Sequence, residues 1–495
     1  MSRREIPELL RQEQGLFVDG SFRPARAGVS TSVRNPATGE ELSTVAAAEA
    51  ADVEDAVRAA ERAFGLWKNV SKVDRSRVLL QVADAVERHG EALAQIESLN
   101  TGRVILETRD DVSATADLFR YFAGVIRSAE ESVVRHDAST MTIIYREPYG
   151  VVGQIVPWNF PFLIAGWKLA PALAAGNSVV IKPATLTPLS LLAFAEITAD
   201  IIPGGVLNVL PGAGSKCGAA LTAHPRVRKL AFTGSTEVGR GIARAAAERV
   251  VPVTLELGGK SANIIFPDAP MERALEAAVM GILYGQGQVC SAGSRVLVHE
   301  EIHDRVVEEL TRRFEGIRIG DPLDEQNRMG PLISEDQFRT VAEYVKKGVA
   351  EGAKLLTGGK RLTGGPYESG YYMAPTLFDG CAGGMEIVQE EIFGPVLVVQ
   401  SFRDDEEAIQ LANDCRYGLA GAVWTRDINR ALRVTAAIET GTIWVNDYHP
   451  VPSGSPFGGY KESGHGREVH KSALEGYTQL KSVFINQNEA PYGYY

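Results

Sequence analysis

Apolar residues follow two alternating patterns from Tyr149 onward. Short apolar runs predict buried strands, at 151–156, 178–182, 206–210 and 229–232. Between these runs, apolar residues three and four positions apart predict helices, at 163–175, 188–202, 216–223 and 237–247. Strands and helices that alternate in this way predict a parallel sheet with right-handed crossovers, which binds ligands beyond the carboxyl ends of its strands.

The same alternation restarts after Gly259 and predicts a second α/β unit. Its strands are expected at 263–266, 295–298, 395–402, 419–424 and 442–445. Its helices are expected at 272–285, 302–314, 335–351, 405–415 and 427–439. No linker rich in Ser or Pro separates the two halves, so we expect them to pack tightly.

The first 150 residues read as extended segments followed by helices. Residues 15–50 are predicted to be extended, and a helix is predicted from about Asp52, which is a suitable N-cap. A second helix is predicted from Asp74 through Leu93, and a third over 116–125. Strands are predicted at 141–145 and 480–485, and an exposed edge of this kind favours pairing with another chain.

Composition excludes several classes of function. The net charge of -11 argues against a nucleic-acid or anionic-membrane surface. No apolar run approaches the roughly 20 residues that a membrane span needs, and the first 14 residues do not resemble a secretory signal. The four cysteines show neither a C-x-x-C pair nor metal-ligand spacing, so we expect a cytoplasmic protein without a metal.

Cys290 and Glu256 are the candidate reactive groups. Free cysteines are usually buried and inert, which is our interpretation of Cys217, Cys381 and Cys415. Cys290 instead follows a loop with glycines at 285 and 287, where a backbone N–H is free to face an oxyanion. Glu256 ends a predicted buried strand, where it serves either as a salt-bridge partner or, with its pKa raised by burial, as a general base.

Two further strand ends carry polar groups. Asn159 lies in a proline-framed turn after the strand 151–156, and its side-chain amide is suited to a developing oxyanion. Residues 232–239 form a strand, a glycine turn and a helix start, which together can receive a pyrophosphate. This segment is not G-x-G-x-x-G, so it is weak evidence by itself.

Together these strings resemble the aldehyde dehydrogenase superfamily, and the resemblance covers nearly the whole chain. The matching strings are PWNFP (157–161), IKPA (181–184), FTGS (232–235), LELGGK (255–260), GQVC (287–290), EEIFGP (390–395), PFGGYK (456–461) and SGHGRE (463–468). The resemblance implies an NAD- or NADP-dependent aldehyde dehydrogenase with a Rossmann-like dinucleotide-binding domain (1–125 and 148–257) and an α/β catalytic domain (258–447). It also implies a small β arm for oligomerisation (126–147 and 476–495), and hence a homodimer or homotetramer.

The resemblance assigns a catalytic role to five residues. It implies that Cys290 attacks the aldehyde, that Asn159 holds the oxyanion, and that Glu256 activates the water that hydrolyses the thioester. Lys168 and Glu468 match a proton path beside the base in some relatives, and a purely structural ion pair explains them equally well.

The resemblance also implies contacts to the cofactor. Lys182 matches the ligand of the adenosine ribose, Ser235 a pyrophosphate contact, and Glu391 with Phe393 the nicotinamide side. The other positions assigned to the cofactor are Ile155, Pro157, Trp158, Thr185, Gly214, Phe232, Gly234, Val238, Gly239 and Leu257.

Thr185 departs from the pattern of many NAD-preferring relatives, which carry Glu three residues after this lysine. A neutral residue removes the repulsion of a 2′-phosphate, and its hydroxyl could donate to that phosphate. We therefore expect NADP to be accepted alongside NAD. The alternative is that Thr185 only caps the next helix and that NAD is preferred.

The resemblance further implies an aromatic-lined tunnel for a small aldehyde. Its residues are Phe160, Trp167, Val289, Ser291 and Phe457. Phe457 stands where betaine-aldehyde dehydrogenases have Trp, which weakens the case for a cationic substrate. Asp111 and Asp447 either attract an amine or are solvated surface charges, and the second interpretation is favoured.

Two other classes of function compete with hydrolysis. A CoA-acylating semialdehyde dehydrogenase would use Cys290, but that subgroup generally lacks the base that Glu256 provides. A non-catalytic structural or binding protein on the same fold would not need Cys290, Glu256 and Asn159 together.

Overall fold

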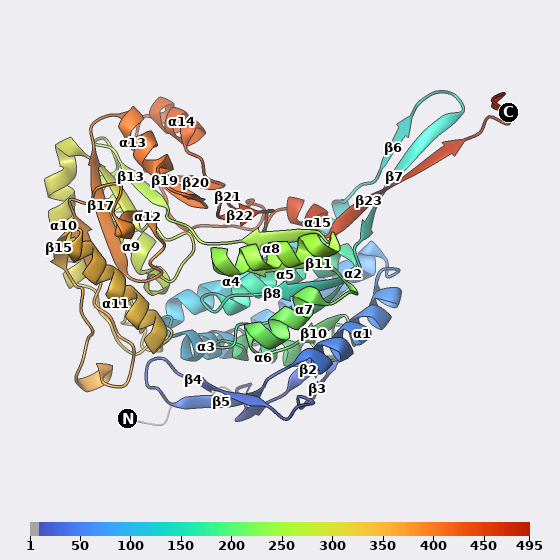
Figure 1. Cartoon of the computed structure of the whole chain (residues 1–495), viewed down its shortest axis with the longest axis horizontal. Coiled ribbons are helices and arrows are strands. Elements are labelled where there is room, and N and C mark those ends of the chain that lie inside the picture. Colours follow the sequence, from blue (N-terminus) through green and yellow to red (C-terminus); the bar gives the residue numbers. More distant parts are fainter. Residues whose placement is uncertain (1–8) are drawn as a thin grey trace.

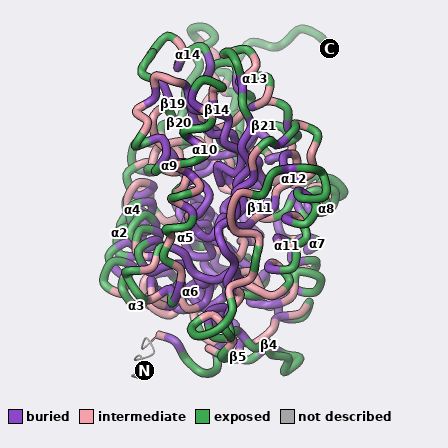
Figure 2. The backbone as a smooth tube through the Cα atoms, turned by 90° about the vertical axis from the view of Figure 1, so that its left-hand side faces the viewer, coloured by how far each residue is buried: buried purple, intermediate pink, exposed green. Residues whose placement is uncertain are grey.

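Two lobes and a projecting arm make up the molecule (Figure 1). The computed structural model describes residues 9–495. The first eight residues, to which the predictions about the N-terminus and the first domain extend, lie outside the described part. Each lobe consists of a sheet covered by helices, and buried residues concentrate along the middle of the molecule (Figure 2).

The first lobe is built on an eight-stranded sheet. Its strands, in order across the sheet, are β22 (Gly464–His465), β12 (Val253–Glu256), β11 (Val227–Thr233), β8 (Val151–Ile155), β9 (Ser178–Lys182), β10 (Leu207–Val209), β2 (Leu16–Val18) and β3 (Ser21–Arg23). The five strands from β12 to β10 are parallel. Every residue of β9 is buried, as the apolar run Val179–Ile181 predicts.

Helices cover both faces of this sheet. The helices of the lobe are α1 (Ala50–Trp67), α2 (Lys72–Arg88), α3 (Gly90–Thr101), α4 (Ile105–Ser128), α5 (Pro161–Ala175), α6 (Leu189–Ile197), α7 (Ala219–Ala223) and α8 (Thr236–Arg249). Helices α2 to α6 contact one another on one face, and α1, α7 and α8 lie on the other (Figure 2). The chain order reverses between β8 and β11, so the carboxyl ends of these strands border a crevice suited to a ligand.

The second lobe contains a seven-stranded sheet. Its order is β15 (Lys354–Thr357), β16 (Thr376–Asp379), β17 (Val396–Phe402), β14 (Arg295–His299), β13 (Ala262–Ile265), β19 (Ala420–Trp424) and β20 (Thr442–Val445). Its helices are α9 (Met271–Leu283), α10 (His303–Glu315), α11 (Glu335–Ala350), α12 (Glu386–Gln389), α13 (Asp405–Asn413) and α14 (Ile428–Ala437). Except for β15, these strands are parallel, which confirms the predicted second α/β unit.

The arm is a three-stranded antiparallel sheet that stands away from the body (Figure 1). It consists of β6 (Ser132–Arg135), β7 (Thr140–Pro148) and β23 (Thr478–Asn486), which follows the short helix α15 (Ser472–Gly476). Smaller sheets are formed by β1 (Glu13–Gln14), β5 (Glu41–Ala46) and β4 (Ser30–Arg34), and by β18 (Tyr417–Gly418) with β21 (Tyr460–Lys461). Among residues 9–495, no helix combines the length and the apolar character that crossing a bilayer requires.

Three predictions about the N-terminal helices are wrong in position. The N-cap of α1 is Glu49, and Asp52 instead accepts the Glu49 backbone N–H as part of a capping box. Leu93 belongs to a separate helix, α3, because α2 ends at Arg88 and His89 separates the two helices. Helix α4 begins at Ile105, three turns before the predicted start at 116. The prediction missed these turns because acidic side chains in them pair with the buried Arg103 and do not face solvent.

Candidate active site

The loop before Cys290 has an unusual backbone. After α9 ends, a single 3-10 turn (Tyr284–Gly287) contains three residues with positive φ: Gly285 (56°), Gln286 (59°) and Gly287 (72°). A side chain at Gly287 would collide with the Gly394 carbonyl, so glycine is required there. We call residues 284–290 the nucleophile loop, because this turn delivers Cys290 to the active-site cavity.

Cys290 borders a cavity of about 230 Å³. All five residues predicted for the aldehyde tunnel line this cavity with it: Phe160, Trp167, Val289, Ser291 and Phe457. The Trp167 and Phe457 rings are 5.1 Å apart, and the Phe160 and Tyr284 rings are stacked at 6.1 Å. The cavity therefore offers a small molecule aromatic walls and one thiol.

Asn159 lies beside the same loop. It follows β8 directly, is buried, and its Nδ2 donates to the Gln288 carbonyl at 2.8 Å. This bond brings the side-chain amide within two residues of Cys290, where a second amide hydrogen and the Cys290 backbone N–H can serve one oxyanion.

The thiol of Cys290 is strongly protonated in this arrangement. Burial, together with smaller contributions from the nearby Glu391 and Glu256, raises its pKa to about 12. A thiol with this pKa is a weak nucleophile at neutral pH, so it needs a nearby positive charge or a base before it attacks.

Glu256 is a buried carboxyl group at the end of β12. Within the described chain, neither of its oxygens has a hydrogen-bond partner. Burial raises its pKa well above the ordinary value and Glu468 raises it further, while Lys168 and Arg467 oppose the shift. This shift favours the protonated form of the carboxyl group and makes its ionised form a stronger base than an exposed carboxylate.

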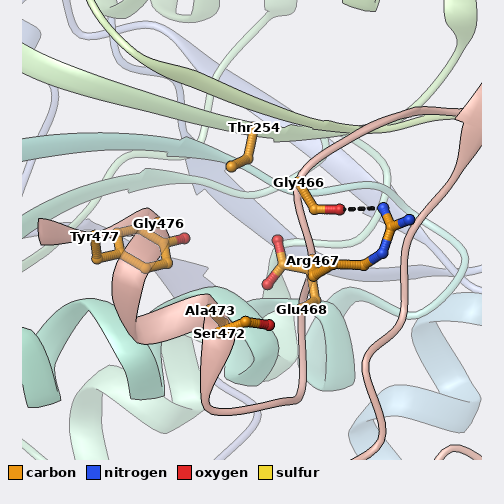
Figure 3. Close-up of a pocket in the computed structure, with 8 residues that line it drawn as sticks. All are labelled: Thr254, Gly466, Arg467, Glu468, Ser472, Ala473, Gly476 and Tyr477. Atoms are coloured by element: carbon orange, nitrogen blue, oxygen red, sulfur yellow. Dashed lines mark hydrogen bonds between the residues drawn. The ribbon is translucent and has the colours of Figure 1, made fainter. Parts of the chain in front are cut away.

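Lys168 and Glu468 form a buried ion pair next to this carboxyl group. The Lys168 Nζ is 2.7 Å from Glu468 Oε1, and both side chains are almost fully buried. Glu468 is placed there by the pairing of β22 with β12, which aligns Gly464 with Glu256. Glu468 also lines a second cavity of about 270 Å³, together with Thr254 and Tyr477 (Figure 3).

The residues predicted for the cofactor gather at the carboxyl ends of the first sheet. At the end of β8 lie Ile155, Pro157 and Trp158, and at the end of β9 lie Lys182 and Thr185. The turn from β11 into α8 contains Phe232, Gly234, Ser235, Val238 and Gly239. Leu257 follows β12, and Gly214 begins the π turn before α7. Ser235 is the N-cap of α8, whose first N–H groups suit a pyrophosphate. A side chain at Gly239 would collide with Leu257, so glycine lets the first turn of α8 pack closely against the residue that follows β12.

Glu391 and Phe393 belong to the second lobe and approach from the opposite side. The Phe393 ring packs edge-on against Trp158 at 5.2 Å, and Glu391 accepts the Gly259 N–H at 3.0 Å. Burial raises the pKa of Glu391 to about 7. The lobes thus bring both sets of predicted cofactor residues together, and a dinucleotide fits the polar groups and glycines found there.

Thr185 does not cap the following helix. The N-cap of α6 is Pro188, and the Thr185 hydroxyl donates to the Gly212 carbonyl at 3.1 Å. The alternative that Thr185 serves only as a cap is therefore wrong. Thr185 therefore leaves this position without the negative charge that a glutamate would bring. Its hydroxyl hydrogen is already donated to the Gly212 carbonyl, so Thr185 supplies no free hydrogen-bond donor.

The prediction of a solvated surface charge is wrong for Asp111. Its side chain is 3% exposed and pairs with Arg103, so it is a buried ion at the cavity wall. Asp447 is partly exposed and pairs with Arg273 at 3.3 Å.

Sequence reasoning missed several residues around the site. The positive charge of Arg467 lowers the pKa of Glu256. The cavity beside Cys290, which we call the aldehyde cavity, is also lined by Asp110, Asp117, Tyr284 and His449. Asp110, Ala114 and Asp117 follow helical spacing, so starting α4 at 105 would have revealed this face. His449 has a positive φ of 76° in a loop, for which the sequence carries no comparable signal.

Comparison with known proteins decides what this site belongs to. The sequence model of the Aldehyde dehydrogenase family matches residues 22–483. The chain belongs to the aldehyde dehydrogenase family. It is 44% identical to the DhaS protein of Bacillus subtilis (strain 168) over 487 residues, which cover 98% of each chain.

Solved structures agree with this assignment. The NAD+ complex of an aldehyde dehydrogenase from Bacillus cereus matches with a TM-score of 0.96 and 42% identity, covering 99% of both chains. A betaine aldehyde dehydrogenase from Staphylococcus aureus, also in complex with NAD+, matches with a TM-score of 0.97 and 40% identity, covering 99% of this chain and 98% of that one. These matches confirm the predicted α/β fold with a Rossmann-like domain and a catalytic domain. This aldehyde dehydrogenase is an NAD(P)-dependent enzyme that oxidises an aldehyde to a carboxylic acid.

Proposed function

We propose that this aldehyde dehydrogenase works by the hydrolytic route, with Cys290 as nucleophile and Glu256 as general base. The observation that carries the proposal is the convergence of a thiol at an aromatic cavity with a buried carboxyl group close enough to shift its pKa. A panel of aldehydes with NAD+ or NADP+, followed by the absorbance of the reduced cofactor, tests it. Failure of every aldehyde to reduce either cofactor would contradict it.

Cys290 and Asn159 would carry out the first half of the reaction. The Cys290 thiol gives up its proton to solvent, and the sulfur then adds to the aldehyde carbon. The resulting oxyanion receives N–H groups from Asn159 and from the Cys290 backbone. The nicotinamide, when bound, brings a positive charge and accepts the hydride. Lys182, Ser235, Glu391 and the Gly234–Gly239 turn would hold the dinucleotide.

Glu256 would carry out the second half. Its carboxylate takes a proton from water, which attacks the Cys290 thioester and releases the acid. The proton can then pass toward the Lys168–Glu468 pair, since Glu468 and Lys168 both act electrostatically on Glu256. A CoA-acylating enzyme has no need of such a base, so Glu256 favours hydrolysis.

Turnover is expected to rise with pH through and above neutrality. Glu256 has a pKa well above its ordinary value, and it acts as a base only when ionised, so kcat should be low below its folded pKa and increase above it. Measuring kcat from about pH 6 to about pH 9 checks this. A kcat that is constant over this range would contradict the role of Glu256 in a rate-limiting hydrolysis.

Cofactor preference is expected to depend on Thr185. We propose that NADP+ is accepted because position 185 carries no negative charge. Thr185→Glu should raise the KM for NADP+ by at least about tenfold relative to that for NAD+, because a carboxylate repels the 2′-phosphate. The uncharged Thr185→Gln, of the same length as Glu, is the control and should change the ratio much less. If the wild-type enzyme does not turn over NADP+ at all, the proposal is wrong.

We propose a small apolar or aromatic aldehyde as the substrate. The support is the aromatic wall formed by Phe160, Trp167 and Phe457. The Staphylococcus aureus relative is a betaine aldehyde dehydrogenase, and Asp110 and Asp117 at the cavity would tolerate a cationic tail. Comparing betaine aldehyde with a neutral aldehyde of similar size separates the two substrate classes.

The arm bears on how the protein assembles, and the composition bears on where it acts. We propose a homodimer or homotetramer formed through the arm, since Val133, Leu480 and Phe484 expose apolar side chains on it. We propose a cytoplasmic enzyme without nucleic-acid or membrane partners, supported by the net charge of -11 and by the buried free cysteines.

A further inference from the structure

A carboxylate from α4 holds the nucleophile loop from behind. Glu107 accepts the backbone N–H of Gly285, which is 3.1 Å from each of its two oxygens. Gly285 is the first of the three positive-φ residues before Cys290. Gln286 supplies a second attachment, since its Nε2 donates to the Gly102 carbonyl at 3.0 Å. The loop is thus fixed to the segment that leads into α4.

Arg103 connects this carboxylate to the wall of the aldehyde cavity. Its Nε donates to Glu107 at 3.2 Å, and its guanidinium also pairs with Asp111. The same guanidinium lies 3.9 Å from the Phe160 ring centre and 5.3 Å from that of Tyr284. Phe160 follows Asn159 directly in the chain, and Tyr284 begins the nucleophile loop. The buried guanidinium of Arg103 therefore packs against the neighbours of both proposed oxyanion donors.

The nucleophile loop needs such support. Of its three consecutive left-handed residues, the two glycines adopt this conformation without steric cost, but Gln286 has a side chain and adds a strain of about 1–2 kcal/mol. The Gly285 N–H is buried, so without Glu107 it would lack a hydrogen-bond acceptor. A Cβ at Gly285 would lie 3.6 Å from Arg103 Nε and 3.8 Å from Phe160, which shows how closely the cluster packs on the loop.

We propose that Glu107 is a positioning residue for the reaction, which fixes the nucleophile loop and through it the two oxyanion donors. The inference rests on the proposed role of Cys290. Gly285 also accepts the Gln288 N–H, at 3.0 Å, and the Gln288 carbonyl in turn holds the Asn159 amide. Displacement of Gly285 therefore moves Asn159 and the Cys290 backbone N–H relative to each other.

Two substitutions of Glu107 separate geometry from charge. Glu107→Asp keeps the charge beside Arg103 but withdraws the carboxylate from Gly285 by one methylene. Glu107→Gln loses the charge but keeps an oxygen that accepts the Gly285 N–H. Thr108→Val is the matched control, because Thr108 is the next residue, is buried and hydrogen-bonds Ala94, yet has no bond to the loop.

The readouts are the burst rate of reduced cofactor per titrated Cys290 thiol, the Kd for NAD+ and the thermal midpoint. Glu107→Asp should slow the burst by about 10- to 100-fold with an unchanged Kd. Glu107→Gln should restore the burst to within about threefold of wild type, because one acceptor oxygen suffices. Thr108→Val should lower the thermal midpoint and leave the burst unchanged.

Other results would overturn the inference. If Glu107→Asp lowers only the thermal midpoint, as Thr108→Val does, Glu107 is merely structural. If Glu107→Gln slows the burst and Glu107→Asp does not, the charge of the carboxylate and not its position is responsible. If Glu107→Asp does not fold, Gln286→Ala provides the test. Loss of the hydrogen bond to Gly102 should slow the burst by about three- to tenfold. An unchanged burst in Gln286→Ala would contradict the inference. A wild-type enzyme that reduces neither cofactor with any aldehyde refutes the proposed function itself, whereas a normal wild-type reaction with unaffected variants refutes only the role of Glu107.

Discussion

Cys290→Ala is expected to abolish aldehyde oxidation, lowering kcat by at least about 10⁴-fold. Alanine cannot form the covalent bond that holds the aldehyde carbon while hydride leaves, and no other thiol among the described residues lines the aldehyde cavity. The measurement is the initial rate of cofactor reduction at saturating aldehyde, together with the Kd for NAD+, which should not change.

Cys381→Ala provides the control for this substitution. Cys381 is buried in the second lobe and lies outside the aldehyde cavity. Its removal should leave kcat unchanged, with at most a small loss of stability from the cavity it creates. Retention of more than about 1% of wild-type activity in Cys290→Ala would show that the sulfur is not the nucleophile.

Glu256→Gln is expected to separate the two halves of the reaction. The burst of reduced cofactor should persist, while steady-state turnover falls by about 10²- to 10⁴-fold because water is no longer activated. Burial raises the pKa of the Glu256 carboxyl group and so favours its uncharged form, and an uncharged amide of the same shape should therefore be accommodated with little loss of stability. Stopped-flow absorbance followed over many turnovers distinguishes the two phases.

Two additions sharpen this experiment. Hydroxylamine, which attacks thioesters without a general base, should restore turnover of Glu256→Gln. Coenzyme A added to the wild-type enzyme should neither raise the rate nor yield an acyl-CoA. Loss of the burst itself in Glu256→Gln would mean that Glu256 acts before the thioester forms, and acyl-CoA formation would favour the acylating alternative.

The sequence predicted the centre of the fold better than its periphery. The predicted strands at 178–182 and 442–445 agree with the structure to the residue. For 178–182 the reason is that an apolar run buried on both faces has little freedom in where it begins. The reactive groups were predicted for a related reason. Glu256 ends a strand, Asn159 lies in the turn that follows a strand, and Cys290 comes shortly after a glycine turn, which are the places where α/β sheets present their functional groups.

Features that depend on distant partners could not be predicted from local pattern. The first turns of α4 carry Glu107 and Asp111, which look solvated until Arg103 is placed between them. Strand β22 has two residues and no pattern of its own, yet its pairing with β12 puts Glu468 beside Glu256. The hydrogen bond from Thr185 to Gly212 likewise joins residues 27 positions apart.

The central claim is that one sulfur and one carboxyl group act on the same carbonyl carbon. The most direct test is to mix Glu256→Gln with aldehyde and NAD+, quench in acid within the burst phase, and determine the mass of the peptide that contains residue 290. The account predicts an acyl adduct on Cys290 in nearly all active sites of Glu256→Gln, and this adduct should decay much more slowly than any adduct on the wild-type enzyme. An unmodified Cys290 peptide after a full burst, or an adduct on another residue, would contradict it.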